Sequence, residues 1–192
     1  MSANLHREAC RLAFSLASPE RLDPRISLAS TLQHMDPESV AEVILQSIPY
    51  SGFPAAVEAL GWLRQQAPES TPNLRQKHSR DVFREVYSDA ADKVGDQLAS
   101  RHPDLQKWIQ EFAYGTVMAS GSLSTVEMEL LAISSLLAQS RMTPFHSHLR
   151  GAIRCGAQGA QLYQLLTDLE DVAHPDSLQT ARELLQKELN PS

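Results

Sequence analysis

Apolar residues recur along this chain at intervals of three and four, and no segment shows the sustained alternation of a half-buried strand. Such a pattern predicts amphipathic helices, each with one apolar face laid on a core. The predicted fold class is therefore all-α. Three stripes carry this prediction most clearly: Leu105, Trp108, Ile109, Phe112 and Ala113; Val40, Val43, Ile44 and Ile48; and Ser177, Leu178, Ala181, Leu185 and Leu189.

The stretch VEMELLAISSLLA, residues 126–138, is apolar on nearly all sides. Its only polar residues are two glutamates and two serines, which predicts a helix that is buried on most faces. Asp36 and Pro37 form a typical helix start, with an N-cap side chain followed by proline at the first helical position. The YSGFP stretch, residues 50–54, predicts a tight turn at its glycine, followed by a helix whose apolar face is Ala56, Val57, Leu60 and Leu63.

The polar segment at residues 66–76 contains two prolines and is the best linker in the chain. The parts on either side repeat at an offset of about 121 residues. Residues 7–18 lie against residues 128–139, with Glu8 on Glu129, and residues 27–45 lie against residues 148–166, with Ser27 on His148. We therefore predict two tandem repeats, with a truncated copy over 1–65, the linker over 66–76 and a nearly complete copy over 77–192.

Composition excludes several classes of function. The formal net charge is −6 and no dense Lys/Arg cluster occurs, so a nucleic-acid partner is not expected. The longest nearly uncharged stretch, Leu130 to Ser140, is too short to cross a bilayer, which predicts a soluble cytoplasmic protein with no membrane partner. Cys10 and Cys155 stand apart without Cys-x-x-Cys spacing and are expected to be structural thiols.

Three motifs of the second copy resemble the carboxymuconolactone decarboxylase family, which includes the alkylhydroperoxidase D proteins. EFAYGTVM resembles the family's aromatic-Gly turn, GSLSTVEMELLAISSLLA its glutamate-led buried helix, and HSHLRGAIRCGA its His-x-x-x-Ala-x-x-x-Gly helix. The step of 19 residues from Glu129 to His148 equals the family's Glu to His step. In the first copy, IPYSGFPAAVEAL resembles the family's Tyr-x-Gly-x-Pro-Ala-Ala. The resemblance implies an alkylhydroperoxidase D-like helical fold and assembly into a homo-oligomer.

The departures from the family pattern narrow the expected chemistry. Arg141 and Pro144 stand where the peroxidase and disulfide-reductase members carry their two cysteines, so a dithiol mechanism is disfavoured. The decarboxylase branch lacks those cysteines and keeps the Glu and His, as here. That branch tends to have arginine before the glutamate, whereas this chain has Met128 there; the first copy has Arg7 before its glutamate but Ser27 in place of histidine.

The resemblance implies cofactor-free acid/base chemistry on a small carboxylated lactone or a related acid. Histidine suits such proton transfer because its ordinary pKa lies near neutrality, and a carboxylate can fix its tautomer. We predict His148 as the acid or base and Glu129 as its orienting partner. Four further residues are candidates for the substrate site: Arg150 and Arg141 for carboxylates, Tyr50 as a pocket wall, and Glu8 as a second partner of the histidine.

Several alternatives stay open. At about 1.5 Å per residue, Glu129 lies roughly 15 Å before its helix ends and His148 about 6 Å into the next, so contact requires a steep crossing or a bridging water. The alternative is that His148 is a packed structural residue. In that case the chain is a degenerate family member that acts as a binding or assembly module. His146 points to another face than His148, and no metal-site spacing occurs, so no metal is predicted. A polar cavity lined by His148, a glutamate and an arginine would favour the enzyme.

Overall fold

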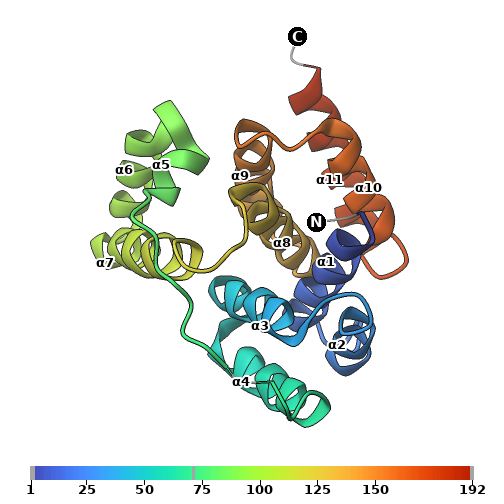
Figure 1. Cartoon of the computed structure of the whole chain (residues 1–192). Helices are drawn as coiled ribbons and strands as arrows, with labels where there is room; N and C mark the ends of the chain where they lie inside the picture. Colours follow the sequence, from blue (N-terminus) through green and yellow to red (C-terminus); the bar gives the residue numbers. More distant parts are fainter. Residues whose placement is uncertain (1–2, 71, 191–192) are drawn as a thin grey trace.

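The chain folds as a set of packed helices, in agreement with the predicted all-α class (Figure 1). The computed structural model describes residues 3–70 and 72–190. Within these ranges the only β structure is an isolated bridge between Lys77 and Ser120.

The helices follow one another with short connections, apart from the segment between α4 and α5 (Figure 1). The first group is α1 (Ala3–Ala17), α2 (Pro24–Thr31), α3 (Pro37–Gln46) and α4 (Ile48–Gln66). The middle group is α5 (Val82–Tyr87), η1 (Ser88–Ala90), α6 (Ala91–Arg101), α7 (Pro103–Trp108) and η2 (Ile109–Met118). The last group is α8 (Thr125–Ala138), α9 (Met142–Arg154), α10 (Gly159–Asp168) and α11 (Pro175–Leu189).

The core is built around α1 and α8, which lie side by side at the centre of the molecule (Figure 1). The hydroxyl of Ser135 on α8 donates a hydrogen bond of 3.2 Å to the carbonyl of Ala13 on α1, so the two backbones approach closely. Helix α8 is buried on almost every side, as its sequence predicts. Its start is fixed by Ser124, whose side chain and that of Glu127 cap each other's backbone N–H groups.

Two of the three predicted apolar stripes face the core, and the third does so only in part. The stripes that begin on α3 and α11 are buried except at their last residues, Ile48 and Leu189, which are half-buried. Asp36 caps α3 by accepting a hydrogen bond of 2.9 Å from the amide of Ser39. The predicted stripe on α7 and η2 is wrong in part, because Trp108 is 63% exposed. Ile109 and Ala113 of the same stripe are half-buried and pack against the core. The π-helix η2, whose i→i+5 turns are wider than those of an α-helix, begins only after Trp108. Its buried side chains are instead Tyr114, Val117 and Met118.

The turn predicted at residues 50–54 is a kink inside α4. Gly52 has φ +81°, a left-handed conformation that glycine adopts without strain. The helix that follows buries Ala56, Ala59 and Leu63. The predicted face is therefore wrong at Val57, which is 69% exposed, because the buried face runs through Ala59 instead.

The predicted linker falls in the non-helical segment between α4 and α5, and its end is anchored to the loop before α8. The amide of Gly121 donates to the carbonyl of Gln76 at 2.9 Å, and Arg75 forms an ion pair with Glu42 on α3 at 3.7 Å. The same Glu42 carboxylate accepts a hydrogen bond of 3.0 Å from the amide of Leu123. These contacts tie the linker to α3 and to the loop before α8, while the division into repeats stays a prediction.

Candidate active site

Helices α8 and α9 bring Glu129 and His148 into direct contact. The Nδ1 atom of His148 lies 3.2 Å from Oε1 and 3.1 Å from Oε2 of Glu129. No bridging water is needed, although the count of helical rise made direct contact doubtful. Part of the discrepancy is that α9 begins at Met142, so His148 lies deeper in its helix than expected.

A glycine on α9 makes this close approach possible. Gly151 lies one helical turn after His148 and faces α8 and α5. A Cβ atom at this position would lie 2.5 Å from Oε2 of Glu129 and 2.7 Å from Cγ1 of Val86, both far inside van der Waals contact. A side chain at residue 151 would therefore push the carboxylate away or separate the helices.

Burial makes the pair electrostatically significant. Glu129 has no exposed surface and His148 is 8% exposed. A buried carboxylate is costly unless it is paired, and here the imidazole Nδ1 supplies the partner. Because both carboxylate oxygens face Nδ1, they hold the proton on that nitrogen. The other nitrogen, Nε2, makes no hydrogen bond to any residue that the structure describes.

Three tyrosines surround the pair. The ring of Tyr50, on α4, meets the His148 ring edge-on with centroids 5.5 Å apart. The hydroxyl of Tyr114 donates a hydrogen bond of 3.1 Å to that of Tyr87. Burial raises the pKa of all three phenols, and the nearby charge of Glu129 raises each of them further. The phenols therefore remain neutral hydrogen-bond donors, and Tyr50 makes the site composite because it comes from the N-terminal part of the chain.

The other predicted site residues are not brought to His148. Arg150 is half-exposed and pairs with Glu188 on α11, with Nε 3.6 Å from Oε2. Arg141 is exposed, at the residue before α9. Glu8 accepts a hydrogen bond of 2.7 Å from the hydroxyl of Ser30, within the first helices. The structure thus joins Glu129, His148 and Tyr50, and leaves the two arginines and Glu8 elsewhere.

Tyr87 and Tyr114 were missed by the sequence analysis as members of this cluster. Tyr114 lies in the aromatic-Gly motif, to which the sequence analysis gave no role at the site. Tyr87 lies in the short helix α5, and its place depends on how α5 packs on α9 and η2. No local pattern around Tyr87 could have predicted that contact.

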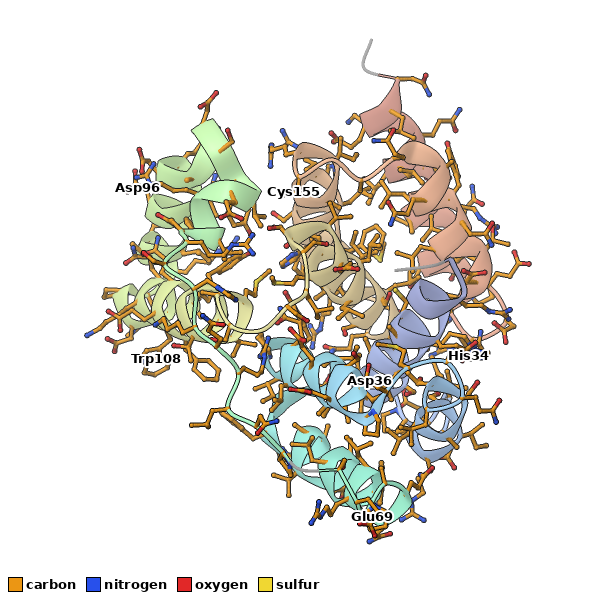
Figure 2. The ribbon with its side chains drawn as sticks, viewed as in Figure 1. His34, Asp36, Glu69, Asp96, Trp108 and Cys155 are labelled. Atoms are coloured by element: carbon orange, nitrogen blue, oxygen red, sulfur yellow. The ribbon has the colours of Figure 1, made fainter. Side chains whose placement is uncertain are left out.

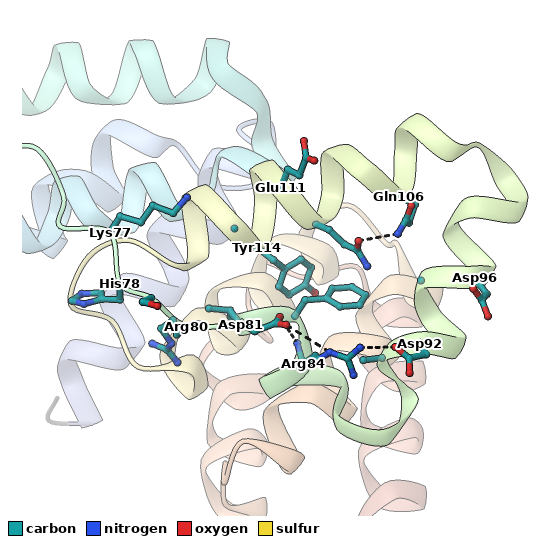
Figure 3. Close-up of a pocket in the computed structure, with 17 residues that line it drawn as sticks. Lys77, His78, Arg80, Asp81, Arg84, Asp92, Asp96, Gln106, Glu111 and Tyr114 are labelled. Carbon is teal, nitrogen blue, oxygen red and sulfur yellow. Dashed lines mark hydrogen bonds and ion pairs between the residues drawn. The ribbon is translucent and has the colours of Figure 1, made fainter.

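A groove of about 930 Å³ lies on the other side of Tyr114 (Figure 3). It runs between α5, α6, η2 and the end of the linker, with Phe83 and Tyr114 among its lining residues. Its rim carries both acidic and basic side chains (Figure 3). Among them, Arg84 forms ion pairs with Asp81 and Asp92. His148 does not line this groove, so the predicted cavity that joins histidine, glutamate and arginine is not found there.

Neither cysteine is suited to thiol chemistry. Burial raises the pKa of the Cys155 thiol to about 11, and its Sγ lies 3.6 Å from the carbonyl of Glu85. Burial raises the pKa of Cys10 to about 12. A nucleophilic cysteine needs a depressed pKa, so both thiols are in unfavourable surroundings. Nearby, Nε2 of His146 lies 2.7 Å from Oε1 of Glu188, and the described residues contain no cluster of three or more side chains that could hold a metal.

These features define an all-helical protein with a buried histidine–glutamate pair. Residues 103–187, from the start of α7 into α11, match the model of the carboxymuconolactone decarboxylase family. This part of the chain is a carboxymuconolactone decarboxylase family domain with the alkylhydroperoxidase D-like helical fold, and it contains both Glu129 and His148.

Two relatives extend the likeness beyond this domain. The chain is 25% identical over 151 residues to Peroxisomal protein 2 of Saccharomyces cerevisiae, a match that covers 60% of this chain and 53% of the relative. It is 24% identical over 145 residues to Peroxisomal protein 2 of Schizosaccharomyces pombe, with 68% of each chain covered. The chain thus spans about half the length of the first of these relatives.

The expected location is only partly supported. In the part of the chain that the structure describes, no helix combines the length and the apolar character that crossing a bilayer requires. The predicted cytoplasmic location is not confirmed, because both relatives are named as peroxisomal proteins.

Proposed function

We propose that the chain catalyses metal-independent proton transfer at carbon, as in the decarboxylation of a small carboxylated lactone or a related acid. His148 is the acid or base through Nε2, and Glu129 is its positioning residue. The observation that carries the proposal is the contact of Nδ1 with both oxygens of a fully buried carboxylate. A histidine held in this way has one fixed nitrogen and one that can exchange a proton.

The proposed step uses the residues of the cluster in order. The bond between the carboxylate carbon and the substrate breaks, carbon dioxide leaves, and the electron pair moves onto the neighbouring carbonyl as an enolate. Protonated His148 then delivers its Nε2 proton to carbon, and water returns a proton to the imidazole. Glu129 stabilises the imidazolium, and Tyr50, whose pKa is raised by burial, is a neutral phenol beside the reacting ring.

A second candidate function is a binding or assembly module without catalysis. The observation that favours it is that Arg141 and Arg150, expected to bind carboxylates, do not lie at His148. A thiol-dependent peroxidase or disulfide reductase is the least favoured function, because the pKa of the Cys155 thiol is raised. We therefore expect Cys155→Ser to leave any activity unchanged. The two candidate functions differ in whether His148 binds a small molecule.

The names of the relatives also bear on the place and partners of the chain. They make the peroxisome the first compartment in which to look for the protein, ahead of the cytoplasm. A small-molecule substrate and a homo-oligomeric state complete the proposal.

The proposal is tested with His148→Asn and a matched control, His146→Asn, on the same helix. Carboxymuconolactone and a panel of β-keto acids and small dicarboxylates are the substrates, with carbon dioxide release as the readout. His148→Asn should lower turnover by about 10²- to 10⁴-fold, the usual worth of a general acid or base. His146→Asn should change it little, since that imidazole binds Glu188 away from the tyrosines.

The module predicts a different result. There the wild-type chain turns over none of these compounds, and the NMR signal of the His148 ring does not move when any of them is added. That pair of results would reject the proposed chemistry. Ligand-dependent movement of the His148 signal, lost in Glu129→Gln, would support the pair as the reacting centre.

A further inference from the structure

Three residues of the stripe on α7 and η2 that was expected to lie on the core are open to solvent. Leu105, Trp108 and Phe112 are 37%, 63% and 38% exposed. They follow one another by three and four residues and share one side of the helix. Figure 2 shows the Trp108 side chain pointing away from the body of the molecule. Nothing in the described part of the chain covers this tryptophan.

The exposed face continues onto α4. The ring of Phe53 packs against that of Phe112 with centroids 5.7 Å apart, which joins the two helices at the surface. Phe53 is 59% exposed, and Val57, one turn further along α4, is 69% exposed. We define the α4–α7 patch as Phe53, Val57, Leu105, Trp108 and Phe112. Five large apolar side chains gathered on one surface are typical of an interface rather than of a free monomer.

The charges beside the patch indicate which partner fits it. The patch itself contains no charged residue. Lys107 and Glu111 flank Trp108 on α7 and η2, both are exposed, and neither has an ion-pair partner among the described residues. They are four residues apart on the same helix, with opposite signs. An antiparallel copy of this helix would set each of them near the opposite charge.

We propose that the α4–α7 patch is the interface between two copies of this chain, related by a two-fold axis near the middle of α7 and η2. The same surface then serves both copies, as a two-fold interface requires. Trp108 of one copy packs near Phe112 of the other, and Lys107 pairs with Glu111 across the axis. The net charge of −6 on each copy opposes association, so the apolar contact supplies the stabilisation.

The interface also lies behind the segment that carries Tyr50. Phe53 follows Tyr50 by three residues across the kink at Gly52, so one end of this segment contacts His148 and the other belongs to the patch. Association would hold this segment from the outside. The interface is nevertheless independent of the chemistry proposed for His148, and either can fail alone.

The test is the mass of the chain in solution, measured by sedimentation velocity over micromolar concentrations. The wild-type chain should be a dimer, and Trp108→Glu should weaken dimerisation by at least about tenfold, as for a central aromatic anchor. Tyr163→Glu is the control, because Tyr163 is 43% exposed on α10, outside the patch. A monomeric wild-type chain, or a Trp108→Glu variant that stays as dimeric as the control, overturns the proposal.

A charge exchange tests the two-fold geometry. Lys107→Glu and Glu111→Lys should each weaken the dimer, because each places like charges across the axis. The double variant should restore association close to that of the wild-type chain, which non-specific contact of apolar surfaces would not do. Failure of the double variant to recover would reject the antiparallel arrangement.

Discussion

Glu8 and Glu129 are aligned by the predicted repeat, yet they have different surroundings. Glu129 is fully buried and contacts the imidazole of His148. Glu8 is half-buried and accepts a hydrogen bond of 2.7 Å from Ser30. In the same alignment Ser27 stands for His148, and Ser30 for Gly151.

The difference shows that the histidine and the glycine depend on each other. On α9 the missing side chain at Gly151 leaves room for the Glu129 carboxylate to reach His148. On α2 the hydroxyl of Ser30 binds the carboxylate instead, so no imidazole is needed to satisfy it. Two aligned positions therefore separate a glutamate that contacts a histidine from a glutamate held by a serine.

The largest expected effect is on the cores of the two aligned helices. Leu131 on α8 and Cys10 on α1 are both buried and occupy aligned positions. Leu131→Ala should lower the free energy of unfolding by about 2 to 5 kcal/mol, because it leaves a cavity among side chains that cannot collapse. Cys10→Ala removes a single buried heavy atom and should cost roughly 1 kcal/mol. Urea denaturation of both variants measures the difference, and equal losses would contradict the buried, central place of α8.

A smaller effect is expected at the position that separates the two glutamates. Gly151→Ser places a Cβ atom where Glu129 and Val86 already lie, and should cost about 1 to 3 kcal/mol by overpacking. It should also displace the His148 ring signal in NMR spectra. The matched variant, Ser30→Ala, loses only the hydrogen bond to Glu8 and should cost about 1 kcal/mol. If Gly151→Ser leaves both stability and the His148 signal unchanged, the close approach at residue 151 is not required.

Local patterns were enough to predict much of this architecture. The helical period predicted the all-α class, the burial of α8 followed from its apolar sequence, and the Asp36 cap followed from residue type. The pairing of Glu129 with His148 came from the resemblance to the family, whereas the count of helical rise made direct contact doubtful. Whether the two side chains touch depended on Gly151, whose role is visible only when α8, α9 and α5 are packed together.

The predictions that were wrong concern what surrounds a side chain in the folded chain. A helical period shows which residues share a face of a helix, but it does not show which other segment covers that face. The stripe through Trp108 was assigned to the core, but only Ile109 and Ala113 of it pack there, and Trp108 is exposed. Arg150 was assigned to a substrate carboxylate because a guanidinium can bind a carboxylate with two hydrogen bonds. In the folded chain it lies on another side of α9, against Glu188.

The smallest expected effect is on the surface of α1, at the position aligned with the fully buried Ala132 of α8. Arg11 holds Asp171 with two hydrogen bonds of 2.7 and 3.0 Å, and these bonds lower the pKa of that carboxyl. A lowered pKa stabilises the fold above the unfolded-state value near 3.9, and this contribution is lost as the pH falls through the folded-state value. Because the Asp171 side chain is 60% exposed, Asp171→Asn should cost less than about 1 kcal/mol at pH 7. The difference from wild type, measured by thermal unfolding from pH 7 to pH 2.5, should shrink toward zero at the acid end.

Asp96→Asn is the control, since Asp96 is exposed and has no ion pair among the described residues. If the loss of stability in Asp171→Asn persists at low pH, the ion pair with Arg11 is not the source of that loss.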